Sequence, residues 1–141
     1  MAQQREATSL AEFIKFQKIG AAVFGVVTSQ GENGNGDFLV MSPAGYRPDL
    51  ATKFDRFGEL AVGISTDMAS KVRTDDTGKL LLLVFVGTKA TAKSPMKLFN
   101  VFEISADEAR GLLEGKAMNA EWMKAPANAS LDTKASAKAP F

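Results

Sequence analysis

The residues most able to do chemistry in this chain are basic and aromatic ones, because it contains neither cysteine nor histidine. Without cysteine there is no disulfide, no thiolate nucleophile and no cysteine-ligated zinc or iron–sulfur centre. Without histidine the commonest general base and the commonest metal ligand are also missing. Asp75 and Asp76 are adjacent in a predicted turn, so their carboxylates point apart rather than converging on one substrate or metal. We therefore expect no enzymatic activity and no cofactor.

Lysines concentrate in and beside one predicted loop, residues 88–95. Lys89 and Lys93 lie in this loop and Lys97 follows it, while no acidic residue occurs from residue 77 to residue 102. The resulting positive field could attract the phosphates of a nucleic acid. The same three lysines are equally compatible with an ordinary solvated turn.

The basic loop is predicted to join two strands. Residues 79–86 form an apolar run with β-branched and aromatic members between two glycines, which is typical of a strand buried on both faces. Residues 96–104 alternate with a period near two, which predicts a strand with one wet face. Phe99 falls on that wet face, where it would be available to stack on a base. Its alternative role is a core ring beneath a C-terminal helix.

A second segment, residues 42–57, is predicted to be a long connection in which basic and aromatic side chains interleave. Its basic and aromatic members are Tyr46, Arg47, Lys53, Phe54, Arg56 and Phe57. Such interleaving suits base stacking supported by cations, although the two phenylalanines could equally seal the open end of a barrel. Further upstream, Lys15 shares a strand face with Phe13, so these two side chains could line a surface together.

The predicted elements follow the order of a small β-barrel. Residues 14–29 carry β-branched side chains and internal glycines, which predicts one long strand that bends at a glycine. The remaining strands are expected at residues 37–41, 58–66, 79–86 and 96–104. The turn at residues 30–36 has a glycine spacing reminiscent of a phosphate loop. A strand follows it rather than a helix, so we reject that interpretation.

Two helices complete the predicted fold. Asp67 is expected to cap a short helix between the third and fourth strands. Ser105 and Glu108 form the pattern of a capping box for a C-terminal helix that stops at Gly115. The order predicts a mainly β protein, a five-stranded OB-fold-like barrel with a short helix between strands 3 and 4 and a C-terminal helix.

Length and composition indicate one domain at residues 11–124, between a flexible N-terminus at 1–10 and a disordered tail at 125–141. Seventeen basic and 16 acidic residues nearly balance, so only the local distribution of charge argues for a polyanionic partner. The chain shows no apolar core of a signal peptide and no apolar run long enough to span a bilayer. We therefore expect a soluble, cytoplasmic protein without membrane contact.

The segments FIKFQKIGAAVFGVV, GKLLLLVFVG and PMKLFNVFEI resemble the OB-fold single-stranded DNA-binding proteins of tailed bacteriophages. The resemblance covers roughly residues 13–104 and lies mostly in apolar pattern and glycine placement. It implies sequence-independent binding of single-stranded DNA during phage DNA replication or recombination, in the host cytoplasm. The residues expected to contact DNA are Lys15, Tyr46, Arg47, Lys53, Arg56, Lys89, Lys93, Lys97 and Phe99.

The resemblance also suggests partners for the tail. Such proteins commonly recruit replication proteins through an acidic C-terminal tail, whereas the tail here is basic and ends in Pro-Phe. Replication proteins are still the expected tail partners, and a homo-oligomer is left open. Two other functions are compatible with the sequence. One is a phage virion structural protein, a capsid decoration or tail component, and the other is an interaction or chaperone-like module without nucleic acid.

Overall fold

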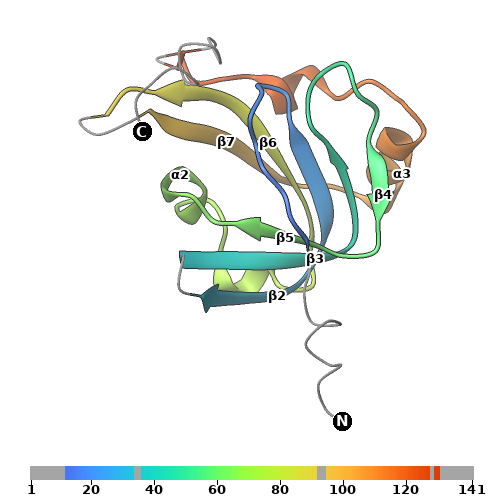
Figure 1. The fold of residues 1–141 in the computed structure, drawn as a ribbon. Coiled ribbons are helices and arrows are strands. Elements are labelled where there is room, and N and C mark those ends of the chain that lie inside the picture. Colours follow the sequence, from blue (N-terminus) through green and yellow to red (C-terminus); the bar gives the residue numbers. More distant parts are fainter. Residues whose placement is uncertain (1–11, 34–35, 92–94, 128, 131–141) are drawn as a thin grey trace.

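The computed structural model describes residues 12–33, 36–91, 95–127 and 129–130 (Figure 1). The strands are β1 (Glu12–Phe13), β2 (Ala22–Asn33), β3 (Gly36–Arg47), β4 (Asp55–Phe57), β5 (Leu60–Gly63), β6 (Leu80–Lys89) and β7 (Met96–Glu103). The helices are α2 (Thr66–Ala69) and α3 (Ala106–Leu113), with short 3₁₀ turns η1 (Thr74–Asp76) and η2 (Ala120–Met123). None of these helices is long and apolar enough to cross a membrane. The predicted flexible N-terminus, residues 1–10, and Lys93 lie outside the described residues.

The strands form one open, curled sheet. Its order is β1-β5-β3-β2-β6-β7, and β4 pairs with the last residues of β3. β1 and β5 are parallel, whereas the other named pairs are antiparallel. The mainly β prediction is confirmed. The predicted five-stranded OB-fold-like barrel does not close, because in the described part of the chain β7 pairs with β6 but with neither β1 nor β5.

β2 starts later than the sequence predicts because Gly20 turns the chain before it. Gly20 has φ = 98°, and a Cβ atom built on it would lie 2.3 Å from Leu50 Cγ, so this turn requires glycine. The single strand predicted over residues 14–29 is therefore wrong, since its first part runs outside the sheet. A glycine does bend β2 itself. The register with β3 shifts after Gly25, where an added Cβ would lie 2.7 Å from Met41 Cβ.

The other strands agree with the sequence to different degrees. β3 extends to Arg47 because its last residues pair with both β2 and β4, so part of the predicted connection at residues 42–57 is strand. β5 is shorter than the predicted strand at residues 58–66. β6 and β7 lie where the apolar run and the period-two segment predict them.

The two helices differ in how well their caps are predicted. α2 is capped by Ser65, whose hydroxyl accepts a hydrogen bond from Met68 N at 3.3 Å, so the prediction that Asp67 is the cap is wrong. Asp67 lies instead in the first turn of α2. For α3 the predicted capping box is confirmed, because the side chains of Ser105 and Glu108 each accept from the other's backbone N–H.

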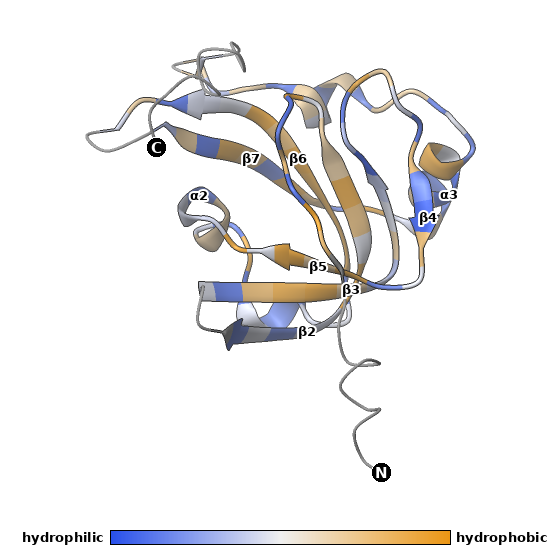
Figure 2. Cartoon of the chain, viewed as in Figure 1, coloured by the Kyte–Doolittle hydropathy of each residue, from blue (hydrophilic) through white to orange (hydrophobic). Residues whose placement is uncertain are grey.

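Two hydrophobic clusters pack on opposite faces of β2 and β6, and Figure 2 shows the hydrophobic stretches on β3, β5 and β6. The inner cluster, inside the curl of the sheet, includes Phe16, Leu39, Leu60, Met68, Leu83, Phe85 and Phe99. The outer cluster, against α3, includes Phe24, Phe54, Leu82, Val84, Ile104 and Leu112. Alternate residues of β6 enter the two clusters, as the two-residue period of a strand requires. The prediction that this strand is buried on both faces is confirmed.

The outer edge of β7 is covered at Phe99 by side chains of α2 and the turn after it. Phe99 N donates to Asp67 Oδ2 at 2.8 Å, and Lys71 Nζ donates to Phe99 O at 2.6 Å. These two side chains occupy the backbone groups that a neighbouring strand would otherwise use. This contact gives a physical reason why the sheet stays open at β7.

The chain after α3 returns along β7 and β6. Trp122 in η2 packs on Phe102 with ring centroids 6.2 Å apart. Ser130 forms a β-bridge with Thr88 through N–H···O bonds of 2.7 and 2.9 Å. The sequence predicts disorder for this segment, but the structure pairs Ser130 with β6. The rest of the tail, residues 131–141, lies outside the described residues.

Candidate nucleic-acid interface

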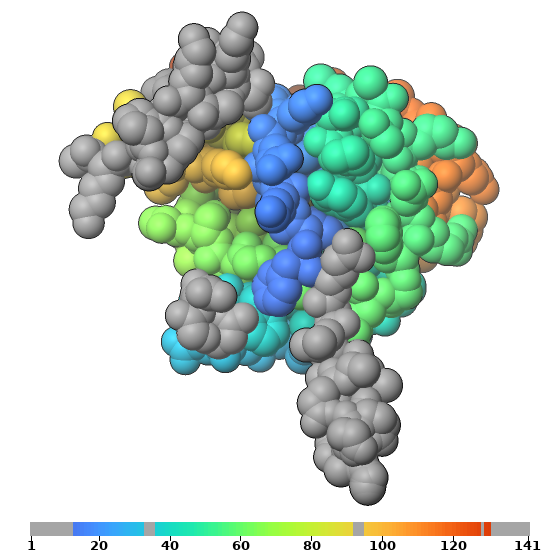
Figure 3. Space-filling model, viewed as in Figure 1, coloured from blue at the N-terminus to red at the C-terminus, as the bar shows by residue number. Residues whose placement is uncertain are grey.

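Residues 12–20, which we call the crossing segment, run across the open side of the curled sheet (Figure 1; Figure 3). The segment starts as β1, parallel to β5, and leads into β2. Backbone hydrogen bonds hold both parts, from Ile14 N to Ala61 O (3.1 Å) and from Gly20 N to Phe85 O (2.9 Å). The crossing segment therefore connects the two sides of the sheet that do not pair with each other.

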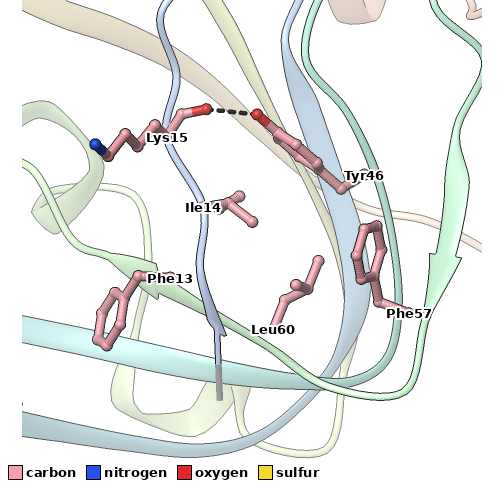
Figure 4. Close-up of a pocket in the computed structure, with 6 residues that line it drawn as sticks. All are labelled: Phe13, Ile14, Lys15, Tyr46, Phe57 and Leu60. Atoms are coloured by element: carbon pink, nitrogen blue, oxygen red, sulfur yellow. Dashed lines mark hydrogen bonds between the residues drawn. The ribbon is translucent and has the colours of Figure 1, made fainter. Parts of the chain in front are cut away.

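Side chains of the crossing segment alternate between the core and the solvent. Phe16 is buried, with its ring 4.8 Å from the ring of Phe99 in an edge-to-face contact. Figure 4 shows the side chains of Phe13 and Lys15 on one side of the segment and that of Ile14 on the other. The prediction that Phe13 and Lys15 share a face is confirmed.

Phe13 and Phe38 form an aromatic pair on the outer surface of the sheet. Phe13 is 49% exposed and Phe38 is partly buried, and their ring centroids lie 5.8 Å apart at an interplanar angle of 76°. Phe13 pairs with Ala61 and Phe38 with Gly63, opposite in direction to the neighbouring core residues of β3 and β5. An added Cβ at Gly31 would lie 3.0 Å from Phe38 Cζ. Small residues of β2 and β5 thus leave space for this ring.

Two lysines bind the backbone at the buried contact between Phe16 and Phe99, and a third, Lys15, precedes Phe16 in the chain. Lys97 Nζ donates to Phe16 O, and burial lowers the pKa of its ammonium group. Lys71 Nζ donates to Phe99 O. In the described part of the chain the ammonium of Lys15 has no ion pair or hydrogen bond, and this residue is exposed. Lys97, predicted as a phosphate contact, therefore has a structural task, whereas Lys15 is available to a ligand.

The two loops beside this surface carry charges of opposite sign. Lys89 is exposed at the end of β6, where the β6–β7 loop begins, and Lys93 of that loop lies outside the described residues. At the β2–β3 hairpin, Glu32 and Asp37 are exposed and lie opposite each other. The carboxylates therefore disfavour a nucleic-acid backbone at the tip of the hairpin, next to Phe38, whereas Lys89 favours one at the β6–β7 loop.

Phe99 is not a stacking platform, and that prediction is wrong. Its side chain is 1% exposed, between Phe16 at 4.8 Å and Phe85 at 5.6 Å between ring centroids. The face of β7 that the sequence predicts to be wet is covered here by the crossing segment and α2. The sequence pattern identified the alternation correctly but could not identify the cover.

Three other residues that the sequence predicts to contact DNA lie away from Lys15. Arg47 is half-buried: its Nε donates to Gly20 O at 3.0 Å, and its guanidinium lies 5.1 Å from the ring centroid of Phe54. Burial lowers the pKa of this guanidinium. Arg56 lines a hollow beside α3, and Lys53 lies beside the end of α3. The structure thus does not bring these three residues together with Lys15 and Lys97.

Tyr46 lies at the other side of the crossing segment. Its hydroxyl donates to Lys15 O at 2.7 Å, and its ring is edge-to-face with Phe57 at 6.4 Å. Burial, and to a smaller extent the charge of Asp49, raises the pKa of this hydroxyl. A hollow of about 190 Å³ opens here (Figure 4). It is lined by Phe13, Ile14, Lys15, Tyr46, Phe57 and Leu60.

The sequence reasoning missed Phe38 and Lys71. A strand at residues 37–41 places Phe38 opposite in direction to Leu39, but Phe38, Leu39, Val40 and Met41 are all apolar, so the sequence does not show which face is exposed. Lys71 had only a weak signal, its position four residues after Asp67. No family model, curated protein or solved structure matches this chain.

Proposed function

We propose that the protein binds single-stranded DNA without sequence preference, across the outer surface formed by Phe13, Phe38 and Lys15. The observation that carries the proposal is the exposed ring of Phe13, held against Phe38 and next to a free ammonium group. A base can stack on such a ring, and a lysine beside it can pair with the adjoining phosphate. Stacking of this kind requires unpaired bases and tolerates any base, because every base has a π-face.

We also propose that the sheet is an open variant of the OB-fold. Counting the five main strands in chain order, β5-β3-β2-β6-β7 is the order 3-2-1-4-5, and α2 lies between the third and fourth strands. OB-folds bind oligonucleotides on the face of strands 2 and 3, between the loops that join strands 1–2 and 4–5. In this chain that face carries Phe38 on β3, and the second loop carries Lys89 and Lys93 as further phosphate contacts. We further propose that the protein binds this DNA during phage DNA replication or recombination.

A titration with fluorescent oligo-dT at two salt concentrations tests the proposal. We expect binding that weakens steeply with added salt, because each neutralised phosphate releases counterions with a slope of about −0.7 per contact for single strands. We also expect only small differences among oligonucleotides of different base composition. Absent binding at low ionic strength would instead favour a virion structural protein.

Phe13→Ala is the sharpest variant for this titration. Losing one stacked base of roughly 1 to 3 kcal/mol corresponds to an affinity loss of about 5- to 150-fold. Leu50→Ala is the matched control, because Leu50 is also exposed, at 59%, but contacts the other end of the crossing segment near Gly20. Equal affinities for the two variants would rule out Phe13 as the platform.

A second pair of variants tests the phosphate contact. Lys15→Ala should flatten the salt dependence by about 0.7 in slope, one phosphate contact. Lys116→Ala removes the same charge next to α3, on the far side of β6, and should leave the slope unchanged. A slope that changes equally in both variants would indicate a response to net charge rather than a contact at Lys15.

A further inference from the structure

We propose that Met118 and Met123 form a modification site for peroxide, and that Arg47 binds the sulfoxide oxygens formed there. Met118 precedes η2 and Met123 ends it. Arg47 Nη2 donates to Met123 Sδ at 3.8 Å and to Met118 Sδ at 4.0 Å, so one guanidinium faces two thioethers. None of these three residues belongs to the surface proposed for DNA binding.

The guanidinium of Arg47 lacks strong acceptors. In the described part of the chain its one oxygen acceptor is Gly20 O, 3.0 Å from Nε, and no carboxylate lies within ion-pair distance. A thioether sulfur is only a weak acceptor. Because Arg47 is half-buried, water compensates only part of this deficit. A sulfoxide oxygen would give the charge a stronger hydrogen bond, since bonds to charged donors are roughly twice as strong as neutral ones.

The reaction needs hydrogen peroxide as its only co-reactant. A lone pair of the thioether sulfur attacks one peroxide oxygen, and the S–O bond forms as the O–O bond breaks. The departing hydroxide takes up the proton of the transferred oxygen and leaves as water, so the sulfur is oxidised and the peroxide reduced. Met118 and Met123 are both partly exposed, so peroxide reaches them, whereas Met41 and Met68 are fully buried.

The position of Arg47 changes what oxidation does to the fold. Oxidation of a methionine in apolar packing normally disrupts it, because the side chain becomes polar. Met118 and Met123 pack against the outer cluster, but their new oxygens would lie next to a guanidinium. The same guanidinium holds Gly20 O at the end of the crossing segment. Oxidation should therefore strengthen the connection between η2 and the crossing segment.

Peptide mapping of the full chain tests the modification site. After mild treatment with hydrogen peroxide, the tryptic peptide of residues 117–124 should carry oxygen on Met118, on Met123 or on both. Met96 is the internal comparison, because it is also partly buried but no donor contacts its sulfur in the part of the chain that the structure describes. Oxidation of Met96 with both other methionines unmodified would overturn the proposed site.

Arg47→Leu tests the role of the guanidinium. Oxidation should lower the melting temperature by at least about 4 °C more in this variant than in wild type, because the sulfoxides then lack their charged donor. With Met118→Leu and Met123→Leu both present, oxidation should have the same effect with and without Arg47. Equal losses in wild type and Arg47→Leu would overturn the proposal. If Arg47→Leu does not fold by circular dichroism, the side-chain NMR signals of Arg47 in wild type decide instead: they should shift on oxidation, and unchanged signals would overturn the proposal.

Discussion

The two covers of the sheet are built in different ways. α3 covers the outer cluster through apolar contacts, and its cap is local, with Ser105 and Glu108 three residues apart. The crossing segment covers the inner cluster, and side chains from distant parts of the chain hold its carbonyl groups. Tyr46 binds Lys15 O from 31 residues away, and Lys97 binds Phe16 O from 81 residues away.

The two covers therefore differ in which of their side chains are left exposed to the solvent. The α3 side has its polar groups satisfied within the helix and presents ordinary charged residues to the solvent. The crossing segment is held through its backbone, so its outward side chains, Phe13 and Lys15, remain free to meet a ligand. We infer that hydrogen bonds to the backbone hold the crossing segment in place and leave its outward side chains available for binding.

The largest effect is expected for Phe16→Ala. Phe16 is buried against Phe99, so its removal should lower the free energy of unfolding by about 3 to 5 kcal/mol, measured by urea denaturation. Phe13→Ala on the same segment should lower it less, by about 0.5 to 1.5 kcal/mol, because Phe13 is half exposed and loses mainly its ring contact with Phe38. A loss below about 1 kcal/mol for Phe16→Ala would show that the crossing segment is not part of the core.

The second-largest effect on the free energy of unfolding is expected from a comparison of two aspartate variants, one in each helix. Asp67→Ala leaves the backbone N–H of the buried Phe99 without its acceptor and should cost about 1 to 3 kcal/mol of unfolding free energy. Asp107→Ala breaks an exposed ion pair with Arg110 in α3 and should cost at most about 1 kcal/mol. Equal losses would contradict the proposed difference between long-range and local bonding.

A third prediction uses pH to examine the bond between Tyr46 and Lys15 O. At pH 8, Tyr46→Phe should lower the free energy of unfolding by about 0.5 to 1.5 kcal/mol. Because the pKa of Tyr46 is raised on folding, its protonated form contributes stability below the unfolded value near 10, and this is lost as pH rises through the folded pKa. The difference between wild type and variant should therefore shrink above about pH 10. A constant difference from pH 8 to 11 would refute this account.

The smallest effect is expected from the tail. Truncation after Lys124 removes the bridge between Ser130 and Thr88 and should lower the free energy of unfolding by about 0.5 to 1.5 kcal/mol. Truncation after Ser130 keeps this bridge and should therefore unfold at a higher temperature than truncation after Lys124. Because the tail is basic, neither truncation should strengthen DNA binding. Clearly tighter binding after either truncation would show that the tail competes with DNA.

Local signals made the α3 side predictable. The capping box at Ser105 and the apolar run of β6 depend on neighbouring residues, and both were located correctly from the sequence. The crossing segment gave no such signal. Its apolar spacing fits a strand, and the close approach of Leu50 that requires a glycine at position 20 appears only in the folded structure.

The candidate site shows the same limit. Whether a lysine is free or engaged is decided by carbonyl groups far away in the sequence, so Lys97 and Lys15 could not be told apart from composition and spacing. Phe99 was misplaced for the same reason, since its cover comes from residues distant along the chain. Phe38 was missed because it stands in a run of four apolar residues, in which the sequence does not show which side chains face the solvent.

The positions of Tyr46 and Trp122 make the two covers optically distinguishable. The chain has one tyrosine and one tryptophan, and they lie beside the crossing segment and in η2 next to Phe102, respectively. Tyrosine absorbance and tryptophan fluorescence thus report on separate regions in one unlabelled sample. Coincident unfolding curves would identify a single cooperative unit, whereas an earlier tyrosine transition would identify the crossing-segment side as a separate folding unit.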